Sequence, residues 1–254
     1  TTKMTLYLKY RPQTISELDL ISVRERLQKI LANQDSMPHA FLFAGPRGAG
    51  KTSAARILAK AVNCEEQSKS KVEPCNKCDQ CVAITKGSSL DVIEIDAASN
   101  RGVDDIRSLR EAVKLATSGA KKKVYIIDEA HMLTTEASNA LLKTLEEPPD
   151  HVIFVLATTA PEKLLDTIKS RCTTLHFIKA SETEVVQSLK RAVDGEKIKV
   201  ADGVLEEIAK NVDGSFREAH KILEQLFTGE NKITIEDVYK LSQMQDSDPR
   251  KLVV

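Results

Sequence analysis

The chain carries the octapeptide Gly45-Pro46-Arg47-Gly48-Ala49-Gly50-Lys51-Thr52, which fits the spacing G-x-x-x-x-G-K-[ST]. An apolar run ends at Ala44, directly before it, and a segment of helical periodicity begins near Lys51. A strand, a glycine-rich turn and a helix in this order are the context in which such a spacing forms a phosphate-binding loop. This context disfavours the alternative, a glycine-rich turn that matches by chance.

A phosphate loop of this kind predicts a division of labour among its residues. The backbone N–H groups wrap the phosphates, and the start of the following helix adds a partial positive charge. We expect Lys51 to reach the β- and γ-phosphates and the Thr52 hydroxyl to ligate Mg²⁺. The sequence therefore predicts a nucleotide site that uses magnesium.

A second apolar run, Val124–Ile127, ends in the two carboxylates Asp128 and Glu129. Asp128 is expected to hold Mg²⁺ through its water shell, and Glu129 to polarise the attacking water as a general base. Acidic residues also cap strands as solvated groups, but the upstream phosphate loop favours the catalytic interpretation.

The same carboxylates continue as Asp128-Glu129-Ala130-His131, which spells the box of a large helicase class. Such a helicase needs two nucleotide-binding domains, whereas this chain has one phosphate loop. We therefore interpret the match as incidental.

Four of the five cysteines, Cys64, Cys75, Cys78 and Cys81, fall in one short stretch. Four thiolates supply the tetrahedral sulfur ligands of a structural zinc site, which has no open position for catalysis. Unliganded cysteines are the alternative. Cys172 stands apart and is expected to be a small buried hydrophobe.

The overall composition limits the classes of partner. Among 254 residues, 37 Lys and Arg balance 37 Asp and Glu, which excludes a globally basic nucleic-acid clamp but not a local basic patch. With no Trp and 4% aromatic residues, recognition by base stacking is disfavoured, so any nucleic acid would be held by its backbone. No membrane span or signal peptide is predicted, and we expect a cytoplasmic protein.

The periodicity predicts an α/β region followed by a helical one. The expected strands are His39–Ala44, Asp91–Ile95, Lys123–Ile127, Val152–Ala157 and Thr174–Ile178. The helices expected between them include Lys51–Val62, with one apolar face, and Leu133–Glu147, which Pro148 stops. Strands that are apolar on both faces indicate a mostly parallel sheet covered on both sides. Beyond these, we expect the helices Ser181–Val193, Ala201–Val212, Ser215–Thr228 and a short one from Thr234.

Taken together, these motifs resemble the gamma/tau subunits of the bacterial DNA polymerase III clamp loader, a family of AAA+ ATPases. The resemblance spans Leu6 to about Leu241. Besides the phosphate loop and the cysteines, it is carried by Tyr10-Arg11-Pro12, Asp96–Val103, Asp128–Leu133, Leu141–Pro149 and Ser170-Arg171-Cys172.

The resemblance implies an AAA+ P-loop NTPase with a Rossmann-like parallel sheet over residues 1–179, including a zinc-binding insert over 64–81. A small all-helical lid domain would cover 180–243, and 244–254 would be a linker toward a collar domain. We therefore expect the chain to be the N-terminal part of a longer protein.

The resemblance also assigns roles to single residues around ATP. Thr159 would be sensor 1, which aligns the hydrolytic water, and Arg217 would be sensor 2, which reaches the γ-phosphate. Arg171 would be an arginine finger that enters a neighbouring subunit's site; without the resemblance, a salt bridge is the better expectation for either arginine. Tyr7, Arg11 and Pro12 are expected near the adenine, although Asp19–Ser22 departs from the family's Val-Gly-Gln-like turn.

The implied function is ATP-driven opening of a sliding clamp and its placement on primer–template DNA. The implied partners are delta and delta-prime subunits, copies of the chain itself in a ring, the clamp, and DNA held by its backbone. Arg101 and Lys143 are candidate phosphate contacts, with a solvated helix face as the alternative. One rival is a delta-prime-type subunit, whose phosphate loop is degraded. The other is an AAA+ motor for Holliday junctions or origins, which lacks the cysteine insert.

Overall fold

The computed structural model describes residues 5–33, 36–66, 72–100, 102–227 and 232–246. The chain divides into two compact units: Pro12–Ile178, called the sheet unit here, and a helical unit made of Thr1–Arg11 together with Lys179–Val254. The sequence assigns residues 1–11 to the first domain, whereas the structure groups them with the helical unit. The reason is that α1 (Leu6–Lys9) packs on α10 (Phe216–Leu226).

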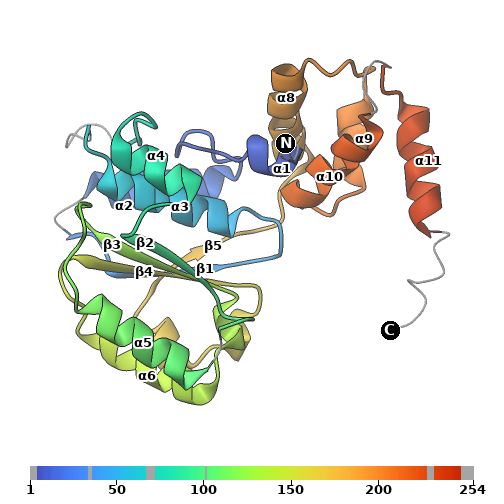
Figure 1. Ribbon diagram of the computed structural model, residues 1–254. Coiled ribbons are helices and arrows are strands. Elements are labelled where there is room, and N and C mark those ends of the chain that lie inside the picture. The colour runs from blue at the N-terminus through green and yellow to red at the C-terminus, as the bar shows by residue number, and fades with distance from the viewer. Residues whose placement is uncertain (1–4, 34–35, 67–71, 101, 228–231, 247–254) are drawn as a thin grey trace. The chain divides into compact units, whose positions relative to one another are not determined.

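The sheet unit is built on five parallel strands in the order β2-β3-β4-β1-β5 (Figure 1). The strands are β1 (Ala40–Ala44), β2 (Val92–Asp96), β3 (Lys123–Asp128), β4 (Val152–Thr158) and β5 (Thr173–His176). Each lies within two residues of the bounds expected from the sequence, which confirms the parallel α/β fold.

The three inner strands are buried on both faces of the sheet. β1 and β4 are buried along their whole length, and β3 is buried up to Ile127. Tyr125 and Phe154 stack across β3 and β4 with ring centroids 5.4 Å apart. The edge strands β2 and β5 are only partly buried, as expected for strands with one neighbour.

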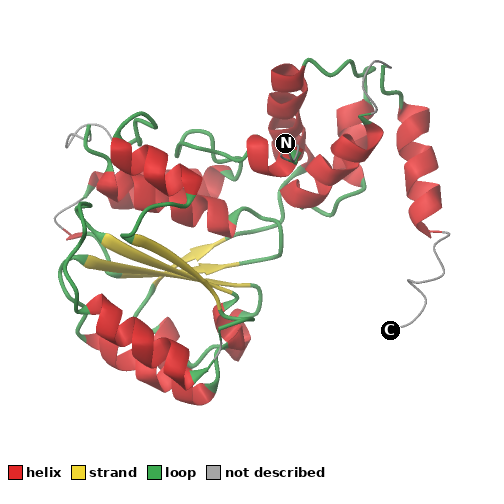
Figure 2. Ribbon diagram, viewed as in Figure 1, coloured by secondary structure: helices red, strands yellow, loops and turns green. Residues whose placement is uncertain are grey.

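Helices form a layer on each face of the sheet (Figures 1 and 2). One layer contains α2 (Ile21–Ala32), α3 (Lys51–Asn63) and α4 (Asp79–Lys86), and the other contains α5 (Val103–Val113) and α6 (Thr135–Glu146). Shorter elements complete this unit: η2 (Ala130–Met132), η3 (Pro161–Lys163) and α7 (Asp166–Lys169).

Two helices differ from their sequence-based descriptions. The helix expected over Lys51–Val62 is present as α3, but its burial extends beyond the expected apolar face, because α3 contacts β3 and β4 as well as α2 and α4. α6 begins at Thr135 rather than Leu133, because the Thr134 side chain accepts a hydrogen bond from Ala137 N (3.2 Å) and caps the helix there.

The helical unit contains α8 (Glu182–Glu196), α9 (Val204–Lys210), α10 and α11 (Ile235–Asp246) in addition to α1. A capping box starts α8: Ser181 Oγ accepts from Glu184 N, and the Glu184 carboxylate accepts from Ser181 N (2.8 Å). α9 starts later than expected because Gly203, in the left-handed conformation, precedes its first turn. Of the expected linker 244–254, residues 247–254 lie outside the described residues.

Candidate nucleotide site and cysteine cluster

The phosphate loop lies where the sequence predicts it, between the end of β1 and the start of α3. Gly45 N donates to Thr158 O (3.1 Å), and a Cβ at Gly45 would come within 2.0 Å of Phe177 O. Gly50 takes a left-handed conformation (φ 93°) directly before α3. Only glycine suits these two positions, because the first is crowded by backbone and the second is unfavourable for other residues.

The Lys51 ammonium is buried inside its own loop. Its Nζ donates to Gly45 O (2.7 Å) and Pro46 O (2.8 Å), and the residue is only 6% exposed. Two neutral carbonyls thus hold a positive charge at the first residue of α3, where the helix dipole is also positive. The loop is therefore a strongly anion-attracting site.

Thr52 and Asp128, both predicted to serve magnesium, contact each other. Thr52 Oγ1 donates to Asp128 Oδ2 (2.8 Å), and Asp128 Oδ1 accepts from Glu129 N (3.0 Å). A hydroxyl and a carboxylate are hard oxygen donors, which suit Mg²⁺. The two residues come from α3 and from the end of β3, a strand that is not adjacent to β1.

Glu129 occupies an unusual backbone position. Its φ of 49° lies in the left-handed region, which is uncommon for residues other than glycine. Its Oε2 atom accepts a hydrogen bond from Thr159 Oγ1 (2.9 Å) and lies 3.4 Å from His131 Nδ1. His131 Nδ1 also lies 2.9 Å from Thr158 Oγ1. The predicted base and the predicted sensor 1 are thus in direct contact.

His131 and Thr158 are site residues that the sequence reasoning missed. The only signal for His131 was its place in the Asp128–His131 box, which was interpreted as incidental. Nothing local in the sequence indicated Thr158.

Arg171 lies away from this group of residues. Its Nη2 pairs with Glu146 Oε1 (2.5 Å), and its Nη1 donates to Thr167 O (2.8 Å). Arg171 comes just before β5, whereas the phosphate loop comes just after β1. Because these strands are parallel neighbours, the two features lie at opposite edges of the sheet.

Arg217, Tyr7 and Arg11 belong to the helical unit and gather there. The guanidinium carbon atoms of Arg217 and Arg11 lie 4.8 and 5.3 Å from the Tyr7 ring centroid. Burial opposes ionisation of Tyr7, but the two guanidinium groups outweigh it and lower the pKa of the phenol. Pro12 is the first residue of the sheet unit.

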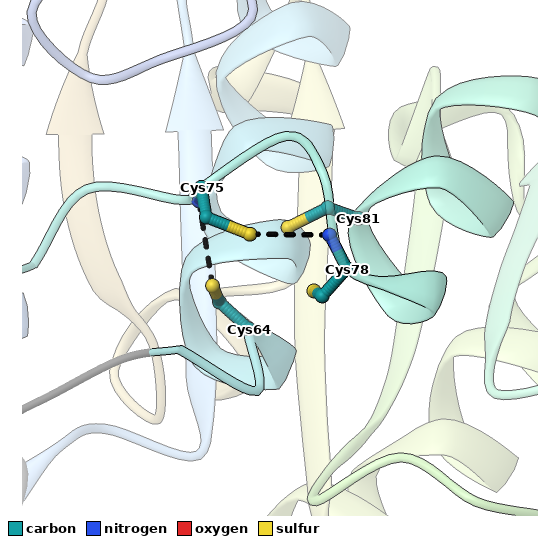
Figure 3. A group of neighbouring side chains, drawn as sticks. All are labelled: Cys64, Cys75, Cys78 and Cys81. Atoms are coloured by element: carbon teal, nitrogen blue, oxygen red, sulfur yellow. Dashed lines mark hydrogen bonds between the residues drawn. The ribbon is translucent and has the colours of Figure 1, made fainter.

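The four predicted metal ligands converge (Figure 3). Cys64 directly follows α3, Cys75 lies in the loop before α4, Cys78 occupies the N-cap position of α4, and Cys81 lies in its first turn. Their sulfur atoms all lie within 4.8 Å of one another, and a tetrahedral Zn–S₄ centre needs sulfur atoms about 3.8 Å apart. The cluster could therefore hold a zinc ion with small adjustments.

Backbone N–H groups favour the thiolate form of Cys75. Cys75 Sγ accepts from Cys78 N (3.2 Å) and Lys77 N (3.4 Å), and these bonds lower the pKa of Cys75 to about 7. Burial raises the pKa of Cys64 and of Cys81. Burial also raises the pKa of Cys172 to about 12, and this residue packs against the hydrophobic core.

The candidate DNA contacts are only partly described. Arg101 lies outside the described residues, and Lys143 is exposed in the last turn of α6. Among the helices of the described residues, none has the length and apolar character needed to cross a membrane.

Comparison with known proteins gives consistent sequence relatives. A family described as DNA polymerase III, delta subunit, matches residues 22–181. The Bacillus subtilis (strain 168) DNA polymerase III subunit tau is 52% identical over 223 residues, which cover 87% of this chain and 39% of that protein. The Escherichia coli (strain K12) subunit tau is 42% identical over 244 residues, covering 94% and 37%. The chain thus spans about two fifths of the length of these relatives.

Solved structures support the fold. The Thermotoga maritima RuvB Holliday junction branch migration motor matches with a TM-score of 0.67 at 21% identity, covering 94% of this chain and 74% of that one. At this identity the likeness supports the fold alone and establishes nothing about the substrate.

Proposed function

Because the chain belongs to the DNA polymerase III delta-subunit family and its sequence relatives are gamma/tau and tau subunits, we propose that it is an ATP-hydrolysing subunit of the bacterial clamp loader. In this role it opens the sliding clamp and places it on primer–template DNA in the cytoplasm. The observation that best supports the proposal is the meeting of the Thr52–Asp128 and Glu129–Thr159 pairs beside the phosphate loop. Asp128 ends β3, and Glu129 and Thr159 directly follow β3 and β4. Thr52 lies in the first turn of α3, after the loop that leaves β1, so the group gathers at the carboxyl edge of the sheet, where ligands of such sheets bind.

In the proposed mechanism the loop binds the triphosphate of ATP. Its backbone N–H groups and the start of α3 surround the phosphates, and the buried Lys51 ammonium is already placed within the loop. Thr52 and Asp128 would hold Mg²⁺, which neutralises charge on the phosphates when it is bound. Positioning and electrostatic stabilisation supply most of the catalysis in this type of phosphoryl transfer.

Glu129 acts as the general base in this proposal. Glu129 Oε2 already accepts a hydrogen bond from the Thr159 hydroxyl, so Oε1 is the oxygen that takes a proton from the attacking water. Thr159 and His131 together orient the carboxylate, in a backbone conformation that would otherwise be unfavourable.

Arg171 serves a neighbouring subunit rather than its own loop. The register pairs Phe41 with Thr173 and Ala44 with His176, so Arg171 lies at the start of the β1–β5 pair and Gly45 at its end. Six residue positions along the strand direction separate Arg171 from Gly45, which is roughly 20 Å at ~3.3 Å per residue. The ion pair with Glu146 is partly exposed, so the side chain can leave it at little cost.

Other roles rest on the family resemblance and stay predictions. They are the contact of Arg217 with the γ-phosphate, of Tyr7, Arg11 and Pro12 with adenine, and of Arg101 and Lys143 with DNA phosphates. The partners proposed are delta and delta-prime subunits, further copies of the chain, the clamp and the primed DNA.

The two rival functions fit the chain less well. A delta-prime-type subunit would have a degraded phosphate loop, whereas here Lys51, Thr52, Asp128 and Glu129 are all present. A branch-migration motor would share the fold, but the relatives at 41–52% identity are gamma/tau and tau subunits.

The proposal is tested by ATP turnover of the full-length protein assembled with its partner subunits. We expect turnover to rise only when clamp and primed DNA are both added. Clamp alone, primed DNA alone and a four-way junction are the controls. Stimulation by the four-way junction, or none by clamp with primed DNA, would contradict the proposal.

A further inference from the structure

A buried lysine links the cysteine cluster to the start of the sheet unit. Lys60, in α3, is only 1% exposed, and its Nζ donates to Gln13 Oε1 and to Asn76 Oδ1 at 2.7 Å each. Burial lowers the pKa of Lys60 to about 8, whereas the charges of Cys81 and Glu17 raise it. A buried ammonium is costly without partners, so these contacts define where Lys60 can lie.

Asn76 belongs to the turn between two predicted metal ligands. It follows Cys75, and its φ of 58° places it in the left-handed region that asparagine tolerates. This turn directs the Asn76 amide oxygen to Lys60 while the N–H groups of Lys77 and Cys78 point to the Cys75 sulfur. The contact with Lys60 therefore depends on the same turn that presents Cys75.

A second contact reaches the same N-terminal segment. The Glu73 carboxylate accepts from Ile15 N (2.7 Å) and Ser16 N (2.9 Å). Ile15 is fully buried, so its N–H needs a partner, and a carboxylate makes a strong one. Glu73 lies only two residues before Cys75, so its position also follows that of the cluster.

We propose that the cysteine insert is a clasp that holds residues 13–16, and that a zinc ion in the cluster keeps the clasp closed. The clasp consists of Lys60, Glu73 and Asn76 on one side and Gln13, Ile15 and Ser16 on the other. Without metal, four thiols make only weak hydrogen bonds, so the turn at Asn76 loses its strongest support. The proposal rests on metal binding by the cluster and is independent of ATP hydrolysis.

The clasp has a definite place in the chain. Residues 13–16 follow Pro12, where the chain passes from the helical unit into the sheet unit for the first time. Zinc would thus determine how firmly one of the two connecting segments is attached to the sheet unit. The residues of the clasp lie outside β3 and β4, so we expect its opening to leave these two strands intact.

Hydrogen exchange measured by NMR tests this inference. The zinc-loaded chain is compared with the same chain after a chelator has removed the metal, and released zinc is measured with a colorimetric indicator. We expect the Ile15 and Ser16 amides to exchange at least about tenfold faster without zinc, while the amides of Val124–Ile127 keep their protection. Equal protection of Ile15 and Ser16 in both forms would overturn the proposal.

If metal removal unfolds the whole sheet unit, hydrogen exchange in zinc-loaded variants tests the clasp contacts instead. Glu73→Ala should speed exchange at Ile15 and Ser16 with zinc still bound, whereas the exposed Glu66→Ala should not. Unchanged exchange in Glu73→Ala would overturn the proposal.

If zinc stabilises the clasp contacts, the clasp contacts must also stabilise zinc binding, because thermodynamic linkage is reciprocal. Asn76→Gly keeps the left-handed turn but removes the amide that binds Lys60, so zinc should leave the variant faster when chelator is added. Lys60→Met should act in the same direction, and the exposed Lys77→Met is its matched control. Zinc release at the wild-type rate in both Asn76→Gly and Lys60→Met would show that the metal does not control the clasp.

Discussion

The Thr159 hydroxyl donates a hydrogen bond to Glu129 Oε2 (2.9 Å). This contact joins the residue after β4 to the residue after β3. The neighbouring strands β3 and β4 bring the two side chains together, although they are far apart in the sequence. This contact gives the proposed general base a fixed orientation.

Replacing Thr159 should therefore slow hydrolysis without weakening ATP binding. A hydrogen bond to a charged group contributes about 1.5–3 kcal/mol, so Thr159→Val should lower kcat by about 10- to 100-fold. Thr159→Ser keeps the hydroxyl and should restore most of the rate. ATP affinity measured by calorimetry and single-turnover rates check this; equal rates in the Val and Ser variants would show that the hydrogen bond is unimportant.

Substitutions of Lys51 and of Glu129 should impair different steps, nucleotide binding and hydrolysis respectively. Lys51→Ala removes the cation inside the phosphate loop and should abolish ATP binding or turnover. Glu129→Gln keeps the shape of the side chain but cannot act as a base, so ATP should bind and remain unhydrolysed. Nucleotide binding and product formation, measured on both variants, distinguish these outcomes. An equal loss of ATP affinity in the two would contradict the assigned roles.

Arg171 should work only across a subunit boundary. An arginine finger contributes roughly 10³ to 10⁵ in rate in related phosphoryl-transfer systems, so Arg171→Ala assemblies should be nearly inactive. Mixing full-length Arg171→Ala with full-length Lys51→Ala subunits should restore part of the turnover, because some interfaces then combine an intact loop with an intact finger.

Glu146→Gln provides the control for this experiment. It removes the ion-pair partner of Arg171 but not the guanidinium, and a partly exposed pair contributes only about 0–1 kcal/mol to stability. Turnover in this variant should stay close to wild type. If mixed assemblies form and remain inactive, Arg171 does not act in trans.

The cysteine cluster should bind about one zinc ion per chain. Metal analysis of protein purified without added zinc checks the stoichiometry, and Cys75→Ser or Cys78→Ser should lose the metal. ATP affinity should change little, because the cluster takes no part in phosphate binding. A disulfide between these cysteines in freshly reduced protein would argue against the metal site.

Local patterns in the sequence predicted the strands, the phosphate loop and the cysteine ligands, because each depends on residues that are close in the chain. Contacts that depend on strand order could not be predicted from these local patterns. Nothing local indicates that β4 lies between β1 and β3, and so nothing predicted His131 beside Thr158.

Burial was also misjudged where several elements meet. The periodicity of α3 predicted one apolar face, but its surroundings bury most of the helix, Lys60 included. A lysine is usually exposed, and the partners that accept hydrogen bonds from the buried Lys60, Gln13 and Asn76, come from other segments of the chain.

The placement of Gly45 and Arg171 at opposite ends of the β1–β5 pair restricts the symmetry of any assembly in which one chain completes the site of another. A two-fold dimer satisfies both sites only when the loop and the finger share one self-complementary patch. When the two lie on separate faces, the contact is heterologous and runs head to tail, so each added copy presents the same unused surface to the next. In an assembly that does not close, the copy at one end lacks a finger for its loop and the copy at the other end has no loop for its finger.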